Sequence, residues 1–108
     1  MGPTYWKEQM KLMLKNDRPD VYKKQKKTGT LDELLTLMAQ KATELFEKNL
    51  EWWNEVYPAT KQYKTENPTP QEISSAHLQN EWEARDMTQE SFPLILITAL
   101  DKQTEAKM

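Results

Sequence analysis

Hydrophobic residues recur at helical spacing in two short stretches before residue 30. Trp6 and Met10 fall on one face of a first amphipathic helix, which ends where polar residues follow. Pro19 in a first turn and Gly29 just past an end delimit a second helix, and Asp17 is its expected N-cap. The sequence therefore predicts two short helices over residues 1–29.

The strongest pattern runs from Thr30 to about Tyr57. Leu34, Ala39 and Phe46 widen its stripe, which favours a bundle helix over a bare two-stranded coiled coil. The positions that define it recur at alternating spacings of 4 and 3, as in a heptad seam: Leu31, Leu35, Met38, Ala42, Leu45, Asn49, Trp52 and Val56. Pro58 is expected to end this long helix.

Two adjacent tryptophans occupy the end of the long helix, where neighbouring side chains point about 100° apart. The heptad phase predicts Trp52 in the core and leaves Trp53 at its edge beside Leu50 and Tyr57. For Trp53 two interpretations remain open: contact with a partner protein, or packing against another tryptophan of the same chain. Asn49 is a polar residue in the seam. We expect it either to fix the register or oligomeric state of a helix pair or to lie where the seam meets solvent.

The sequence KTENPTP, residues 64–70, predicts a connection between two halves of the chain. Thr69 as cap, Pro70 in the first turn and Glu72 in a capping box predict a helical part over residues 70–104. Residues 92–100, FPLILITAL, suit either a buried strand or a helix. Helix is preferred because Ser91 can cap it and no second strand exists for pairing.

These elements predict one all-α domain, a three- or four-helix elongated bundle with one long central heptad-patterned helix. Residues 1–29 form a basic N-terminal head, 30–57 the central helix, 64–70 a connection and 70–104 a C-terminal helical part. The low hydrophobic content of 37% predicts a thin core or one completed by a partner. A second copy of the chain could complete the core, so a homodimer is one expectation.

Charge is distributed unevenly along the chain. Residues 1–30 carry eight basic and three acidic side chains, whereas residues 31–108 carry seven basic and fourteen acidic ones. No run of 18 apolar residues, no apolar signal-peptide core and no cysteine is present, so we expect a cytoplasmic protein that does not enter a membrane.

Residue types needed for common catalytic sites are scarce. The chain of 108 residues contains one histidine, two glycines and no cysteine, so nucleophilic triads and phosphate-binding loops lack their parts. His77 and Glu81 at i, i+4 offer two metal ligands where three or four are needed. The sequence therefore predicts no enzyme, no metal site and no cofactor.

Two charged surfaces are candidates for binding. An acidic, aromatic surface for a partner protein comprises Trp53, Leu50, Tyr57, Glu51, Glu55, Glu81, Glu83 and Asp86. The alternative is sequence-tolerant nucleic-acid binding by a basic helix with one aromatic residue, comprising Arg18, Tyr22, Lys23, Lys24, Lys26 and Lys27. The acidic composition, with a pI near 5.5, favours the first surface, and a self-assembling structural protein is a third hypothesis.

Residues 12–46, LMLKNDRPDVYKKQKKTGTLDELLTLMAQKATELF, carry a recurring set of features. Leu14-Lys15 precede Arg18-Pro19, an aromatic residue stands at Tyr22, a Thr28-Gly29 turn follows, and Leu31 opens the long helix. This segment resembles small accessory proteins of phages and transposons, including the TnpV-like group. The resemblance implies a mobile-element protein without an assigned active site. Together with the missing catalytic parts, it predicts a regulator or inhibitor that binds a host or phage protein, for example a defence protein.

Overall fold

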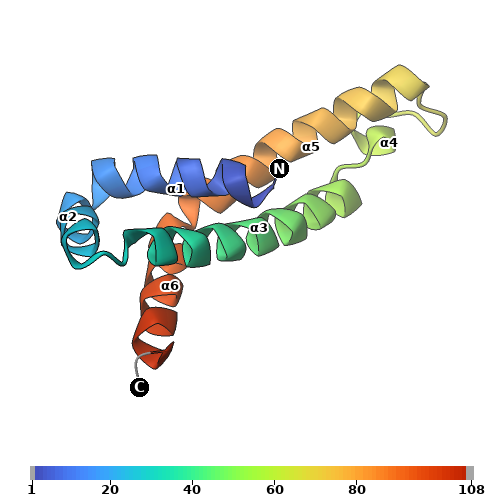
Figure 1. Cartoon of the computed structure of the whole chain (residues 1–108). Coiled ribbons are helices and arrows are strands. Elements are labelled where there is room, and N and C mark those ends of the chain that lie inside the picture. The colour runs from blue at the N-terminus through green and yellow to red at the C-terminus, as the bar shows by residue number, and fades with distance from the viewer. Residues whose placement is uncertain (1, 107–108) are drawn as a thin grey trace. The chain divides into compact units, whose positions relative to one another are not determined.

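The computed structural model describes residues 2–106, and these form helices without any strand (Figure 1). The helices are α1 (Pro3–Asp17), α2 (Pro19–Thr28), α3 (Leu31–Val56), α4 (Ala59–Gln62), α5 (Pro70–Glu90) and α6 (Phe92–Ala106). The all-α class and the long central helix are confirmed. The stretch 92–100 is helical, and Ser91 separates it from α5.

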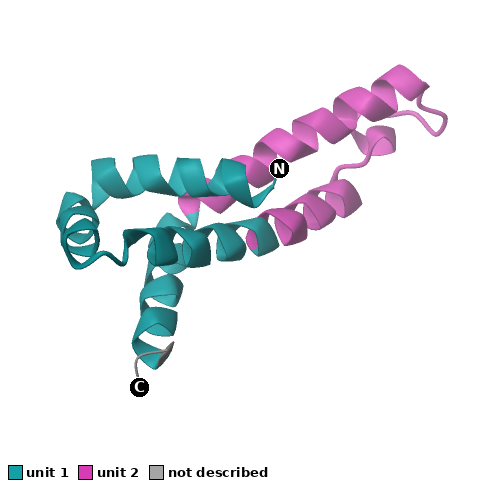
Figure 2. Ribbon diagram, viewed as in Figure 1, with its two compact units in different colours: residues 1–44, 91–108 teal, residues 45–90 magenta. Residues whose placement is uncertain are grey.

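The chain forms two compact units, coloured separately in Figure 2. Unit 1 comprises Met1–Glu44 and Ser91–Met108, and unit 2 comprises Leu45–Glu90. One boundary falls within α3 and the other between α5 and α6. The connection at residues 64–70 therefore lies inside unit 2, whereas its sequence indicated a junction between two halves.

Unit 1 is built from α1, α2, the first part of α3 and α6. The largest of its fully buried side chains are apolar: Trp6, Met10 and Leu14 at spacings of four on α1, Leu34 and Met38 on α3, and the adjacent Ile95 and Leu96 on α6. Burying one such side chain contributes about 1.5–3 kcal/mol. An ion pair of 2.6 Å between Lys7 Nζ and Asp32 Oδ1 joins α1 to the start of α3.

Both ends of α2 follow from single residues. Gly29 has φ 74° and ψ 17°, the left-handed conformation that glycine adopts without strain, and Thr30 N–H donates to Gln25 O at 2.9 Å across the turn. At the start, Arg18 is the N-cap and Pro19 is the first helical residue. The expectation that Asp17 caps α2 is wrong, because Asp17 completes α1 and the Arg18 N–H donates to Leu14 O.

The last turns of α6 are held by a reciprocal amide pair. Gln25 Nε2 donates to Gln103 Oε1 at 3.1 Å, and Gln103 Nε2 donates to Gln25 Oε1 at 3.2 Å and to Thr30 O at 3.3 Å. Gln103 is buried as a result. The helix continues to Ala106, and residues 107–108 lie outside the described residues.

Thr30 also contacts the amide pair through its side chain. Its hydroxyl group donates to Gln25 Oε1 at 2.6 Å and also lies 2.8 Å from the hydroxyl of Thr28. The turn between α2 and α3 is therefore tied to the same network.

Unit 2 is a helical hairpin in which the second part of α3 and α5 are joined through α4 (Figure 2). Pro58 follows the end of α3 and is the N-cap of α4. The capping box of α5 is confirmed: Glu72 N–H donates to Thr69 Oγ1 at 3.1 Å, and Thr69 N–H donates to Glu72 Oε1 at 2.9 Å. α5 turns a stripe of small and polar residues inward: Ala76, Asn80, Ala84 and Thr88.

The tryptophan doublet is placed opposite to the heptad prediction. Trp52 is 48% exposed, whereas Trp53 is half-buried. A straight helix drifts about 20° per heptad, so the three heptads from Leu31 to Trp52 displace Trp52 by about 60°. Trp53, about 100° further round, then lies only about 40° from the direction of Leu31. The assignment of Trp52 to the core is therefore wrong.

Candidate functional site

The C-terminal end of α3 is capped by amide side chains from the neighbouring helices of unit 2. Asn80 Nδ2 donates to Asn54 Oδ1 at 2.9 Å and to Tyr57 O at 3.0 Å. Gln62 Nε2 donates to Tyr57 O at 2.8 Å and to Asn80 Oδ1 at 3.2 Å. Because a helix leaves its last carbonyl groups without internal partners, this network stabilises the hairpin at the end where the connection through α4 joins α3 to α5.

Trp53 is held in a fixed orientation beside this network. Its Nε1–H donates to Met87 Sδ at 2.8 Å, and its ring stacks on Tyr57 with centroids 5.4 Å apart and an interplanar angle of 29°. The ring of Trp52 meets Trp53 at an angle of 81° with centroids 5.1 Å apart. Three neighbours thus fix the indole of Trp53.

A pocket of 240 Å³ opens beside the two stacked rings, lined by Trp53, Tyr57, Gln62, Gln79, Asn80 and Glu83. Its size is below the roughly 300–1,000 Å³ typical of sites for small organic ligands. Gln79 Nε2 donates to Glu83 Oε1 at 3.1 Å, which positions the carboxylate. The pocket is therefore suited to a single side chain, with aromatic, amide and carboxylate groups around it.

The structure brings part of the predicted partner surface together. Trp53, Tyr57 and Glu83 line the same pocket, and Leu50 is half-buried on α3. The carboxylates Glu51 and Glu55 are exposed, but helix geometry places both about 160° round α3 from Trp53. These two residues belong to a different face.

The remaining predicted acidic residues lie on α5. Glu81 Oε1 contacts His77 Nε2 at 3.2 Å, and Asp86 is exposed. Asn49 was expected to set the register of a helix pair, and its Nδ2 donates to Thr88 Oγ1 at 3.1 Å. Asn49 thus joins α3 to α5 within one chain. That Asn49 also sets the oligomeric state of two copies of the chain stays a prediction.

Sequence analysis missed an apolar stripe on the outer face of α5. Leu78 is 56% exposed and Trp82 58% exposed, and the Arg85 guanidinium lies 4.5 Å from the Trp82 ring centroid. Leu78 and Trp82 are four residues apart and each lies about 160° round the helix from its nearest buried neighbours, Ala76, Asn80 and Ala84. This spacing was the signal available in the sequence.

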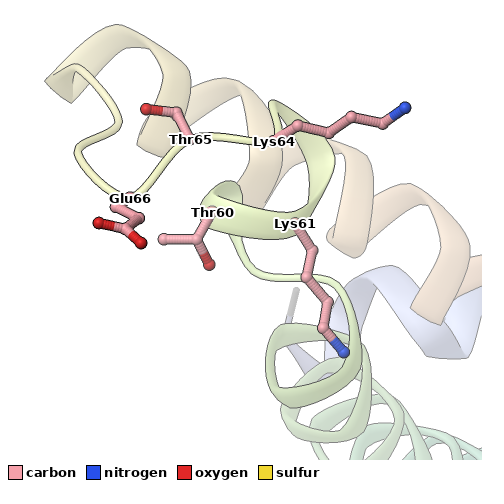
Figure 3. A pocket seen from close by; sticks show the side chains of 5 residues that line it. All are labelled: Thr60, Lys61, Lys64, Thr65 and Glu66. Carbon is pink, nitrogen blue, oxygen red and sulfur yellow. The ribbon is translucent and has the colours of Figure 1, made fainter.

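A larger hollow of 410 Å³ lies on the surface at Thr60, Lys61, Lys64, Thr65 and Glu66. Figure 3 shows the ammonium groups of Lys61 and Lys64 extending in different directions, away from the Glu66 carboxylate. Because no polar groups converge there, this hollow is not a candidate site.

The predicted nucleic-acid surface is exposed but only partly free. Lys23, Lys24, Lys26 and Lys27 are exposed on α2 and pair with no carboxylate within residues 2–106. Arg18 binds Asp20 through two bonds of 3.2 Å, which lower the pKa of the Asp20 carboxyl. Lys15 Nζ lies 5.3 Å from the centroid of the Tyr22 ring. Tyr22, half-buried with one ring face covered, is a poor platform for a base.

Neither a metal-ion site nor a membrane-spanning helix is found within residues 2–106. No group of three or more histidine, aspartate or glutamate side chains is placed to hold a metal ion. None of the described helices combines the length and apolar character needed to span a bilayer. Comparison with known protein families, curated proteins and solved structures found no match.

Proposed function

We propose that this chain is a non-enzymatic helical protein that binds a partner protein through the outer face of α5. The observation that carries the proposal is the inverted character of this helix. Leu78 and Trp82 are more than half exposed, whereas Ala76, Ala84 and Thr88 are buried. Tryptophan is enriched among interface hot spots, and an apolar neighbour such as Leu78 extends the surface that Trp82 offers.

The geometry around Trp82 supports this role. Arg85 covers part of its ring, so the side chain is already ordered before a partner arrives. Tryptophan and arginine are enriched among residues that dominate binding energy. Covering the exposed part of Leu78 and Trp82 on association is favourable by about 25 cal/mol per Å² of apolar surface removed from water.

The charge of unit 2 indicates the chemistry of the partner. Residues 45–90 carry nine acidic and four basic side chains, a net charge of −5. Glu81 and Asp86 flank the exposed stripe of α5 by helix position. A partner with a basic rim around an apolar groove complements this surface, and salt is expected to slow their association.

The biological setting of the proposal is a regulator or inhibitor encoded by a phage or mobile element and acting in the cytoplasm on a host protein. The resemblance of residues 12–46 to accessory proteins of such elements supports this setting. An inhibitor of a host defence protein is one form of it, because a small acidic protein that docks on a basic surface can block a nucleic-acid site.

Affinity capture with matched variants tests the proposal. Trp82→Ala removes the centre of the α5 stripe, whereas Ile97→Ala removes an apolar side chain of equal exposure, 58%, from unit 1. The account expects one host protein that is captured by the wild type and by Ile97→Ala and is lost with Trp82→Ala. Equal capture by all three proteins contradicts it.

A second candidate function is nucleic-acid binding by α2, favoured by its four exposed lysines, which have no carboxylate partner within residues 2–106. It predicts DNA or RNA binding that falls steeply with salt and is lost when Lys23, Lys24, Lys26 and Lys27 are changed to alanine. Self-association through the same surfaces is the third possibility, and light scattering of the purified chain distinguishes a dimer from a monomer.

A further inference from the structure

The pocket beside Trp53 has hydrogen-bond donors that are already used within the protein. Trp53 Nε1–H donates to Met87, and Asn80 Nδ2 donates to Asn54 Oδ1 and the Tyr57 carbonyl. Gln62 Nε2 donates to the carbonyl oxygens of Tyr57 and Ala76. Of the two ends of a side-chain amide, only the nitrogen can donate to a carbonyl oxygen. These contacts therefore fix which end of the Asn80 and Gln62 amides is the nitrogen.

Acceptor capacity remains around the pocket. Asn80 Oδ1 accepts one hydrogen bond, from Gln62, and retains a second lone pair. Glu83 accepts from Gln79, and no cation within residues 2–106 lies at ion-pair distance from its carboxylate. A carboxylate without an internal cation, beside an amide oxygen with a free lone pair, favours a cationic donor group over an anion.

We propose that this pocket holds the guanidinium group of an arginine side chain supplied by the partner protein. The guanidinium is planar, stacks on aromatic faces such as those of Trp53 and Tyr57, and presents five donors to the acceptors of Gln62, Asn80 and Glu83. The volume of 240 Å³ accommodates one side chain. The net charge of −5 on residues 45–90 also favours a positively charged ligand.

This inference rests on the proposed function, because it names the chemistry of a partner residue. The two remain separable, since the pocket lies at Trp53 and Glu83 whereas capture was assigned to Leu78 and Trp82 on the outer face of α5. The pocket therefore has its own ligand, its own variants and its own spectroscopic signal.

The test is an NMR titration of the whole chain with N-acetyl-arginine-N′-methylamide, followed at the four tryptophan indole N–H signals. The Trp53 signal is assigned by its loss in Trp53→Phe. The arginine probe is expected to shift this signal with saturable, weak binding. The matched citrulline probe, which has the same shape without charge, is expected to produce no saturable shift.

Two charge-neutralising variants complete the design. Glu83→Gln keeps the size of the side chain and its capacity to accept from Gln79, and it should weaken probe binding by about tenfold, as expected for a lost hydrogen bond to a charged group. Glu51→Gln removes the same charge from a different face of α3 and should leave binding unchanged.

Three results would overturn the inference: an unshifted Trp53 signal, equal binding of the citrulline probe, or equal loss of binding in both glutamine variants. Equal binding of the corresponding lysine probe would contradict the choice of arginine. If the probe fails while Trp82→Ala still abolishes capture, the pocket assignment fails and the docking function stands. If the probe binds and capture is insensitive to Trp82→Ala, the pocket assignment stands and the docking function of α5 fails.

Discussion

Among residues 2–106, the large apolar side chains that are fully buried lie in unit 1, whereas in unit 2 the buried stripe of α5 is made of alanine, asparagine and threonine. The large apolar residues of α5 are found on its outer face, at Leu78 and Trp82. Charge divides in the same way, because the segments of unit 1 sum to +3 and residues 45–90 sum to −5. The contrast concerns single helices: α1 buries Trp6, Met10 and Leu14, whereas α5 exposes Leu78 and Trp82 and buries small residues.

The largest effect is expected in the core of unit 1. Met10→Ala should lower the free energy of unfolding by about 2–5 kcal/mol, because it leaves a cavity in a fully buried site. Leu12→Ala, at a 55% exposed position on the same helix, is the control and should change it by less than about 0.5 kcal/mol. Urea denaturation measures both, and similar losses in the two variants would contradict the assignment of the core.

A smaller loss is expected from the polar network of unit 2. Asn80→Ala leaves Asn54 Oδ1 without its donor and removes one of two side-chain bonds to the Tyr57 carbonyl. The expected loss is about 1–3 kcal/mol of unfolding free energy. Gln79→Ala, which removes an exposed amide from the same helix, is the matched control in urea denaturation. A neutral Asn80→Ala would show that the network does not hold the hairpin.

The tryptophan doublet sharpens the comparison within one helix. Trp53→Ala should destabilise the chain by about 1–3 kcal/mol, because the indole contacts Met87 and Tyr57. Trp52→Ala should cost less, since nearly half of Trp52 is solvent-exposed. The ranking from the heptad pattern is the opposite one. Thermal unfolding of the two variants decides between them.

The smallest effect concerns the ion pair that starts α2. The hydrogen bonds from Arg18 lower the pKa of Asp20 in the folded chain, so this contact adds stability above the ordinary aspartate pKa and loses it as pH falls towards the lowered value. Arg18→Gln should return the pKa of Asp20 towards the ordinary value, followed by carboxyl NMR. An unchanged titration midpoint would show that the pair does not form in solution.

Local signals predicted the helices well because their causes are local. Thr69, Pro70 and Glu72 fix the start of α5, and Gly29 fixes the end of α2, through contacts within a few residues. The heptad pattern failed at Trp52, where the drift of a straight helix accumulates over three heptads. Local pattern thus loses accuracy with length.

The candidate site depends on partners that are distant in sequence. Asn80 meets Asn54 and Tyr57 through contacts that span 26 and 23 residues, and no periodicity announces them. Sequence analysis did select Trp53, Tyr57 and Glu83, because aromatic and acidic residues suggested binding, but it grouped them with Glu51 and Glu55, which lie on another face. Helix geometry separates Glu51 and Glu55 from Trp53, whereas the meeting of Trp53 and Glu83 depends on the hairpin.

The most direct test of the contrast between α1 and α5 is the unfolding free energy of Trp82→Ala, measured by urea denaturation beside its affinity for the captured partner. We expect the unfolding free energy of Trp82→Ala to lie within about 0.5 kcal/mol of the wild-type value. We expect its affinity for the partner to fall at least about tenfold, and a loss of about 2 kcal/mol corresponds to about thirtyfold. A stability loss above about 2 kcal/mol with unchanged binding would contradict it, because Trp82 would then serve the fold.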